Sequence, residues 1–298
     1  MKSVHKWLLL LATAVIITAA SFVIIFLPPD EDVPFREASL REYSATLPDF
    51  SGSRGEEADI PDRSAILNSL SDQHTSASEW GERVSGVKNR HDTEEKVIAL
   101  TFDACGGPTG NGVDEELLSF LTDYGIPATL FMNYRWIEDH EDRFLELADN
   151  PLFTIENHGT AHLPLSVEGR TAWGIEGTAS PEEVVDEVLI NQEHIASLTG
   201  KAPSHFRSGT AYYDEQAVKI VEMAGLTAVN YDVLGDAGAT YSAAQVESAL
   251  LESRPGSIVL LHMNQPSSGT AEGVKQAVPQ LLDAGYTFVH LGDYPLTE

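Results

Sequence analysis

The fold is decided by the segment VIALTFDACGG, residues 97–107. It begins with a run of apolar residues, which is typical of a buried β-strand. The run ends in a carboxylate, Asp103, and the glycines that follow allow the chain to turn away. In parallel α/β proteins the C-terminal ends of the strands carry the catalytic groups. The segment therefore predicts a buried strand that ends in a functional side chain.

Strand-like and helix-like segments alternate along the rest of the chain. The clearest helix start is SPEE at 180–183, where a capping serine precedes a proline at the first helical position and a glutamate follows three residues after the serine. Strands are expected at 97–103, 126–132, 152–156, 227–233, 257–263 and 286–291, and helices at 113–124, 180–200, 214–224, 242–252 and 273–284. This alternation predicts a parallel α/β domain and leaves open whether its sheet is open or closed.

An apolar run without a charged side chain spans Trp7 to Leu27. Its length suits a transmembrane helix, which needs about 20 residues. Lysines precede the run and acidic residues follow it, which places the N-terminus in the cytoplasm. Small residues at 19–21 leave a cleaved signal peptide as the alternative. Residues 1–27 are thus expected to anchor the protein to the membrane, facing the extracytoplasmic side, or to direct its secretion if they are cleaved.

The chain is strongly acidic, with a formal net charge of -28. Such a surface repels nucleic acids and anionic membranes, so we expect no nucleic-acid partner and membrane contact only through the N-terminal helix. Residues 28–93 are rich in Ser, Asp, Glu, Arg and Pro and predict an acidic, largely disordered linker with a short helix near 65–70. Residues 94–298 form the predicted catalytic domain, whose oligomeric state the sequence does not fix.

Two histidines follow the predicted strand at 152–156. His158 and His162 are four residues apart, so one helical turn places both imidazoles on one face, in a spacing that suits a metal ion. Two surface histidines are the alternative. The single cysteine, Cys105, cannot form an internal disulfide, and it is unpaired, bound or buried. We favour a small buried residue over a nucleophile.

Three more polar groups follow predicted strands. Arg207 lies beside a glycine-containing turn, where it could orient a carboxylate through two parallel hydrogen bonds or form a structural ion pair. Asp236 follows the strand at 227–233 and is either the partner of that arginine or a turn residue. His262 ends the apolar strand at 257–263 and is a candidate acid or a hydrogen-bonded core residue.

In this order the groups resemble the motifs of the polysaccharide deacetylase family, the NodB-homology enzymes of carbohydrate esterase family 4. The matching segments are TFDA at 101–104, HGTAH at 158–162, Arg207 with its Tyr212-Tyr213 turn, Asp236, and LLH at 260–262. The resemblance implies a distorted parallel β/α barrel and a divalent metal, most often zinc. It also implies hydrolysis of N-acetyl or O-acetyl groups on sugar polymers.

The same resemblance implies a role for each matching residue. Asp103 matches the general base, and His262 matches the general acid. Arg207 matches the arginine that orients the base, and Asp236 matches the carboxylate partner of that arginine. The two histidines at 158 and 162 match the metal ligands.

The sequence departs from the family pattern at three places. Ala104 stands where the family has its metal-ligating aspartate, the third motif lacks the usual Pro-Tyr, and the fourth lacks its tryptophan. The missing ligand could be Asp103 itself, a water, or another side chain such as Asp114.

Three functions follow from these residues. The first is a metal-dependent deacetylase of a cell-envelope or extracellular polysaccharide or peptidoglycan. The second is a non-catalytic carbohydrate-binding relative that has lost full metal ligation, and the third is a hydrolase of another non-peptide amide on the same scaffold. The sequence contains no Gly-x-Ser-x-Gly elbow and no P-loop lysine after its glycine-rich segment at 106–110, which argues against a serine hydrolase and a nucleotide enzyme.

Overall fold

Strand β2 (Val97–Ala104) lies at the centre of the fold, and all eight of its residues are buried. It pairs in parallel with β10 (Ser257–His262) on one side and with β3 (Ala128–Met132) on the other. β3 in turn pairs in parallel with β4 (Phe153–Asn157). The computed structural model describes residues 60–70, 76–108 and 110–298. These pairings bring the ends of β2, β4 and β10, which carry predicted site residues, to one edge of the sheet.

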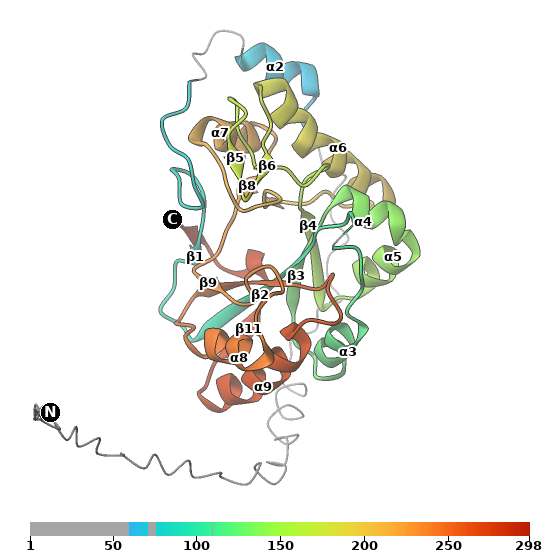
Figure 1. The fold of residues 1–298 in the computed structure, drawn as a ribbon, viewed down its shortest axis with the longest axis vertical. Helices are drawn as coiled ribbons and strands as arrows, with labels where there is room; N and C mark the ends of the chain where they lie inside the picture. Colours follow the sequence, from blue (N-terminus) through green and yellow to red (C-terminus); the bar gives the residue numbers. More distant parts are fainter. Residues whose placement is uncertain (1–59, 71–75, 109) are drawn as a thin grey trace, which may run out of the picture. The chain divides into compact units, whose positions relative to one another are not determined.

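The main sheet has the order β12-β1-β10-β2-β3-β4-β7-β8, with β9 beside β10 and β11 beside β2 (Figure 1). The short strands are β1 (Arg90–His91), β7 (His205–Phe206), β8 (Thr227–Ala228), β9 (Val233–Leu234), β11 (Thr287–Val289) and β12 (Leu296–Thr297). Lys88, before β1, bridges Val229, after β8, so segments near the two ends of this path share backbone hydrogen bonds. The predicted α/β class is confirmed, with a largely parallel half-barrel sheet.

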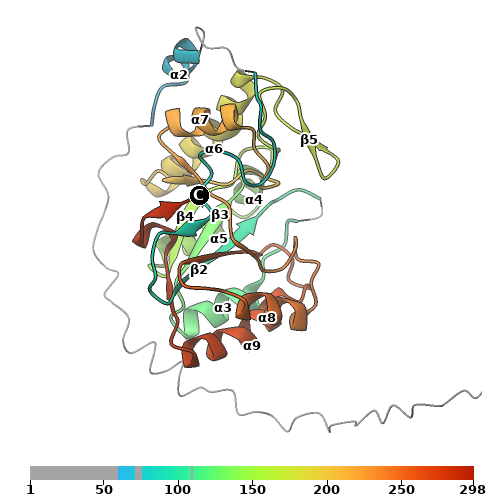
Figure 2. The same cartoon turned by 90° about the vertical axis from the view of Figure 1, so that its left-hand side faces the viewer.

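Helices pack in two groups on this sheet (Figures 1 and 2). The first group is α3 (Glu115–Asp123), α8 (Ala243–Leu251) and α9 (Thr270–Asp283), and the second is α2 (Arg63–Leu70), α6 (Pro181–Thr199) and α7 (Glu215–Met223). Helix α6 begins as the sequence predicts, because the Ser180 hydroxyl accepts a hydrogen bond from the Glu183 amide. It ends at Gly200, whose φ of 71° is the left-handed conformation that glycine adopts without strain.

Several short elements were not predicted from the sequence. They are helices α4 (Tyr134–Asp139) and α5 (Glu141–Asp149) and the hairpin of β5 (Thr171–Ala172) and β6 (Ile175–Glu176), and a 3₁₀ turn covers Leu291–Asp293. The predicted strand at 227–233 is instead two short strands, β8 and β9, which pair with different partners, β7 and β10. Two-residue strands carry too little periodicity to be distinguished, because their pairing depends on distant segments.

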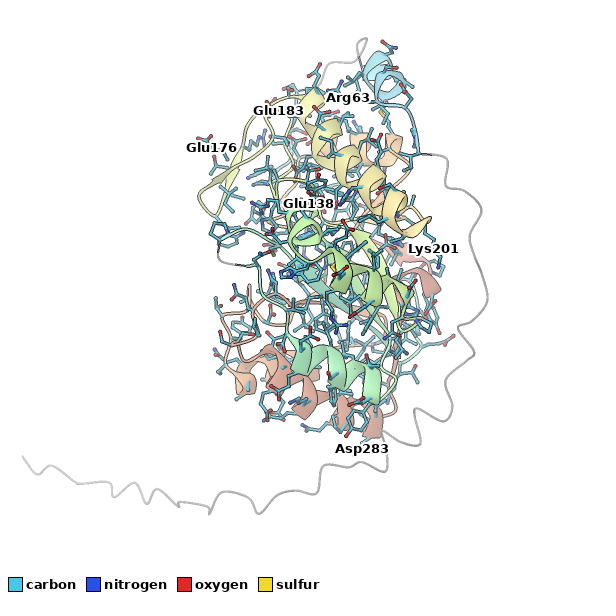
Figure 3. The ribbon with its side chains drawn as sticks, turned by 90° about the vertical axis from the view of Figure 1, so that its right-hand side faces the viewer. Arg63, Glu138, Glu176, Glu183, Lys201 and Asp283 are labelled. Atoms are coloured by element: carbon cyan, nitrogen blue, oxygen red, sulfur yellow. The ribbon has the colours of Figure 1, made fainter. Side chains whose placement is uncertain are left out.

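The predicted linker boundary at residue 93 is corrected by the structure. Ile66, Leu70, Val84 and Val87 are buried in the core cluster that includes α6 and α7. Arg63 of α2 forms an ion pair with Asp186 of α6. Figure 3 labels Arg63 and, on α6, Glu183. Much of the segment at 60–93 therefore belongs to the folded unit, because its apolar side chains complete a core.

The predicted anchor at 1–27 and the linker at 28–59 lie outside the described residues. Within the part of the chain that the structure describes, no helix combines the length and the apolar character needed to cross a membrane.

The two faces of β2 have different surroundings. Ile98, Leu100, Phe102 and Ala104 belong to the main hydrophobic cluster. The alternate positions include Thr101 and Asp103, whose side chains are held by Arg207. Successive side chains of a strand point to opposite faces, so one face of β2 forms the core and the other carries the polar site.

Candidate functional site

Asp103 and Arg207 form a buried ion pair at the end of β2. Arg207 Nη1 donates to Asp103 Oδ1 at 2.8 Å and to Thr101 Oγ1 at 2.9 Å. The predicted partnership of the arginine with the candidate base is therefore confirmed by geometry. The pair fixes one carboxylate oxygen and leaves Oδ2 without a bond to the arginine.

Arg207 is fully buried, and its charge is compensated on several sides. Nη2 donates to the carbonyl of Asn230 at 3.0 Å, and the guanidinium lies 4.2 Å from the centre of the Phe131 ring. A buried charge of this kind is tolerated only when it is paired and hydrogen-bonded. The bonds hold the guanidinium rigidly, so it acts as a fixed support for Asp103.

The second polar pair is His262 with Asp236. His262 Nδ1 lies 2.8 Å from Asp236 Oδ1, and the His262 amide donates to Asp236 Oδ2 at 2.7 Å. Thr270 Oγ1 also donates to Oδ2 of this fully buried carboxylate, at 2.9 Å. The prediction that Asp236 is the partner of Arg207 is wrong, because β9 pairs with β10 and brings the following Asp236 beside the end of β10.

Asp236 controls the charge of His262. Burial lowers the pKa of this imidazole, but the charge and hydrogen bond of Asp236, together with the neighbouring Cys105, raise it by more. The net pKa lies well above its ordinary value, so the protonated ring is favoured. A protonated imidazole with Nδ1 bound to a carboxylate can donate its other proton, as a general acid requires.

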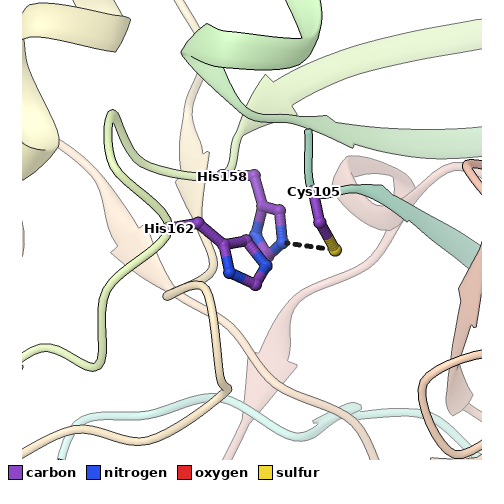
Figure 4. Close-up of side chains that lie close together, drawn as sticks. All are labelled: Cys105, His158 and His162. Atoms are coloured by element: carbon purple, nitrogen blue, oxygen red, sulfur yellow. Dashed lines mark hydrogen bonds between the residues drawn. The ribbon is translucent and has the colours of Figure 1, made fainter. Parts of the chain in front are cut away.

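Cys105, His158 and His162 point toward one another from two loops that follow β2 and β4 (Figure 4). One ligand atom from each lies within 4.8 Å of those of the other two. Cys105 Sγ is 3.8 Å from His158 Nε2, and the two imidazole rings are nearly perpendicular, with centres 4.9 Å apart. The predicted proximity of the two histidines is confirmed, while the place of Cys105 beside them was not foreseen.

These residues fit a divalent metal such as zinc. His158 Nδ1 lies 2.9 Å from the carbonyl of Arg207, so it carries the proton and leaves the Nε2 lone pair available. His162 Nε2 is shielded from solvent and has no hydrogen-bond partner within the described residues. Imidazole nitrogens and a thiolate are ligands that zinc prefers.

The imidazoles also change the acidity of the thiol. Burial raises the pKa of Cys105, but the neighbouring His162 and His158 lower it by more, and the net pKa is well below the ordinary value. Burial lowers the pKa of His158, and the charge of Asp103, the neighbouring Cys105 and the hydrogen bond to the Arg207 carbonyl together raise it by more. The thiolate is therefore accessible near neutral pH.

Glu187 of α6 supports the loop that carries His162. Its carboxylate accepts hydrogen bonds from the amides of Ala161 at 2.8 Å and Leu163 at 3.1 Å. Burial raises the pKa of Glu187 to about 7, although these amides lower it. Gly159 is required by this approach, because a Cβ there would lie 2.4 Å from Glu187 Oε1. Sequence reasoning missed Glu187, since only the tertiary fold brings α6 to the loop.

Two residues bear on the missing ligand: Ala104, which stands in its place, and Asp114, which was considered as its replacement. Ala104 is buried in the main hydrophobic cluster, so the residue at 104 does not face the histidines. Asp114 caps helix α3, where its side chain accepts from the Leu117 amide at 3.0 Å. The structure thus assigns both residues to the fold and not to the site.

A cavity of about 830 Å³ lies between the two polar pairs and the candidate metal ligands. Asp103, Cys105, His162 and His262 all line it. Its wall also contains Thr210, whose hydroxyl is shielded and has no hydrogen-bond partner within the described residues. Sequence reasoning did not single out Thr210, although it lies in the turn after Arg207.

Exposed apolar side chains gather at this cavity. Five large apolar side chains of the described residues are exposed, and Trp173, Ile175 and Leu234 among them line the cavity. Trp173 is 74% exposed at the tip of the β5–β6 hairpin, with its ring edge-on to Tyr212. Its φ of 54° is rare for a bulky residue, so this position combines an unfavourable backbone with an exposed aromatic ring.

Comparison with protein families gives one match. The family model for polysaccharide deacetylase matches residues 90–229. The matched range contains Asp103, His158, His162 and Arg207, and it ends before Asp236 and His262. The last two residues are joined to the others by the fold.

Known proteins similar to this chain include a chitooligosaccharide deacetylase of Bradyrhizobium sp. (strain ANU 289). It is 28% identical over 173 residues, which cover 57% of this chain and 72% of that protein. A CE4 family pseudoenzyme from Bacillus anthracis has a similar fold, with a TM-score of 0.59 and 20% identity over 71% of this chain and 69% of that one. A family 4 acetyl xylan esterase from Clostridium thermocellum, solved with a cobalt ion, has a TM-score of 0.53 and 26% identity over 66% of this chain and 88% of that one.

Proposed function

Because the chain carries a domain of the polysaccharide deacetylase family, we propose that it hydrolyses acetyl groups of a cell-envelope or extracellular polysaccharide or peptidoglycan. The observation that carries this proposal is that a candidate base, a carboxylate, and a candidate acid, an imidazole, line the same cavity. Asp103 is held by Arg207, and His262 is held by Asp236. Asp103 and His262 line one cavity, which Cys105 and His162 also line. A carboxylate base can activate the attacking water and an imidazole acid can protonate the leaving nitrogen, which together promote amide hydrolysis.

Asp103 is the general base of the proposed reaction. Arg207 occupies Oδ1, so Oδ2 is the oxygen that accepts the proton of the attacking water. The rigid guanidinium keeps the carboxylate oriented while the proton moves. His158 and His162 would hold a divalent metal, which would supply Lewis acidity at this site.

His262 is the general acid. Its Nδ1 is engaged by Asp236, so the proton that leaves comes from Nε2. Protonation of the departing nitrogen converts a poor leaving group into an amine. The raised pKa of His262 keeps that proton on the ring until the bond to carbon breaks.

Trp173 supports a sugar polymer as the substrate. Sugar rings have apolar C–H faces that pack against aromatic rings, and exposed apolar side chains beside a cavity mark a ligand groove. Trp173 lines the cavity from the β5–β6 hairpin, in a backbone conformation that carries a cost. A polymer that extends beyond the acetylated unit would contact this ring.

A second candidate function is a non-catalytic carbohydrate-binding protein of the cell envelope. Ala104 favours it, because an alanine stands where the family has a metal-ligating carboxylate. A CE4 family pseudoenzyme from Bacillus anthracis has a similar fold, so this scaffold also occurs in a protein described as a pseudoenzyme. The retained base and acid pairs favour the enzyme.

We also propose that residues 1–27 export the protein and hold it at the membrane, or release it if they are cleaved. The apolar run at 7–27 and the lysines before it support this proposal. The catalytic domain would then meet its polymer outside the cytoplasm.

Acetate release tests the proposed function. The full chain is loaded with zinc or cobalt and incubated with N-acetylated chitin oligomers, peptidoglycan and O-acetylated xylan, and with other N-acyl amides as a comparison. Acetate release that is lost in Asp103→Asn supports a deacetylase. Binding of these sugars without any acetate release, in a folded and metal-loaded protein, supports the second candidate.

A further inference from the structure

We propose that Cys105 is the third protein ligand of the metal ion, completing a site of two imidazoles and one thiolate. The proposal rests on the proposed function only in using the same metal site. In this proposal the sulfur of Cys105 takes the place of the carboxylate that the family has at position 104. Three independent features of the structure support it.

The first feature is the register of β2. Thr101 and Asp103 lie on the face of the strand that meets Arg207, whereas Phe102 and Ala104 lie in the hydrophobic core. Cys105 follows Ala104 directly, so the alternation returns its side chain to the face of Asp103. The cavity lining agrees, since it includes Asp103 and Cys105 but not Ala104. Of Ala104 and Cys105, only Cys105 can therefore offer a ligand atom to the histidines.

The second feature is distance. Cys105 Sγ lies 3.8 Å from His158 Nε2, and all three donor atoms lie within 4.8 Å of one another. A sulfur and a nitrogen bound to one tetrahedral zinc lie roughly 3.5 Å apart. The three side chains thus need only a small adjustment to share one ion. Asp103 lies near His158 but outside this group of three, and its Oδ1 is held by Arg207.

The third feature is charge and chemical softness. Two neutral imidazoles provide no negative charge, and a thiolate provides the same single charge as the missing carboxylate. Thiolate ligands favour zinc and cobalt over magnesium and calcium, which prefer oxygen. When the metal binds, the S–H bond breaks, the proton passes to solvent and the sulfur–metal bond forms.

The test uses Co²⁺ as a spectroscopic probe of the reduced full-length protein. Cys105 is the only cysteine of the chain, so every thiol signal reports this residue. We expect one bound Co²⁺ per chain, a sulfur-to-cobalt charge-transfer band in the near ultraviolet, and the visible spectrum of a four-coordinate ion. Zinc should displace cobalt and slow the reaction of the thiol with a chromogenic disulfide at least tenfold.

Four variants separate the ligand from its surroundings. Cys105→Ser should lose the charge-transfer band and bind metal at least tenfold more weakly. Cys105→Asp should bind one cobalt without the band, because it supplies a carboxylate from the same position. His158→Ala should lose metal binding, and His194→Ala is the matched control, since His194 pairs with Glu138 and does not line the cavity.

Three results would overturn the proposal. They are wild-type protein that binds no cobalt, wild-type protein that binds cobalt without the charge-transfer band, and a thiol whose reactivity zinc leaves unchanged. An acyl adduct on Cys105, detected by mass spectrometry after incubation with substrate, would also overturn it by showing a nucleophile. Acetate release is measured in parallel. Charge transfer without acetate release contradicts the proposed function alone, and acetate release without charge transfer contradicts the ligand alone.

Discussion

The imidazole of His262 is bonded to the carboxylate of Asp236, with 2.8 Å between Nδ1 and Oδ1. These residues come from the end of β10 and from the loop after β9, two segments that meet only because their strands pair. The pair sets both the orientation and the protonation of the ring. It leads directly to a prediction about pH.

Asp236→Asn should move the alkaline limb of the pH–rate profile to lower pH. The acid form of His262 is active, so kcat/KM falls as pH rises through its pKa. Asp236 contributes most to raising that pKa, so its removal lowers the pKa. The limb is measured on metal-loaded protein. Asp293→Asn is the control, because Asp293 is exposed, pairs with His290 and does not line the cavity. An unmoved limb in Asp236→Asn would contradict the assignment of His262 as the proton donor.

Asp103→Asn should lower kcat by on the order of 10²–10⁴-fold, the usual contribution of a general base. The amide cannot take a proton from water, but it keeps the shape of the carboxylate and can still accept a hydrogen bond from Arg207. Metal content, measured by mass spectrometry of the metal, should stay the same. Loss of the metal together with the activity would show that Asp103 is a ligand and not a base.

Trp173→Ala should reduce kcat/KM for long oligomers by about tenfold, the equivalent of losing one aromatic contact of roughly 1.4 kcal/mol. Activity on a short acetylated substrate should change little, because Trp173 comes from the β5–β6 hairpin, whereas the base and the acid come from β2 and β10. Ile190→Ala is a matched control, since Ile190 is exposed on α6 and does not line the cavity. An equal loss for long and short substrates would argue against a polymer contact.

Ala104→Asp should destabilise the protein and should not add a ligand. Ala104 lies in the main hydrophobic cluster, where an unpaired carboxylate costs roughly 2–5 kcal/mol of unfolding free energy. Ala244→Asp, at an exposed position of α8, should be close to neutral. The comparison is made by denaturant unfolding. A stable Ala104→Asp variant with tighter metal binding would place the family carboxylate back in the site.

Glu215 should make the folded state sensitive to acid. Burial raises its pKa, but hydrogen bonds from the amides of Ser78 and Glu79 lower it by more, to about 2. Because the folded pKa lies below the unfolded value of 4.5, its stabilisation is complete above pH 4.5 and is lost as the pH falls toward 2.

Glu215→Gln should therefore cost about 1–3 kcal/mol at pH 7, the range for hydrogen bonds to a charged group, and much less at pH 3. Unfolding by urea at the two pH values checks this. Glu222→Gln is the control, because Glu222 is exposed on the same helix. A cost that does not change with pH would mean that the charge of Glu215 is not what holds the segment at 78–79.

The sequence predicted the long elements well, because each carries a local signal. The apolar run of β2 and the cap and stop of α6 lie where the patterns indicate. The hairpin that carries Trp173 and the helices at 134–149 were missed, since short elements are stabilised by contacts with distant segments. The short helix near 65–70 is present as α2 (Arg63–Leu70), whereas the burial of Ile66, Leu70, Val84 and Val87 in the core was missed for the same reason.

The sequence by itself determined most of the chemical groups at the site, because strand ends carry them in an order that does not depend on packing. It named Asp103, Arg207, His158, His162, Asp236 and His262. Only the tertiary structure decided which of them act together. Strand pairing places Asp236 in hydrogen-bond contact with His262, and Arg207 in contact with Asp103. The alternation of β2 turned Ala104 into the core and Cys105 toward the histidines, because adjacent side chains of a strand face opposite sides.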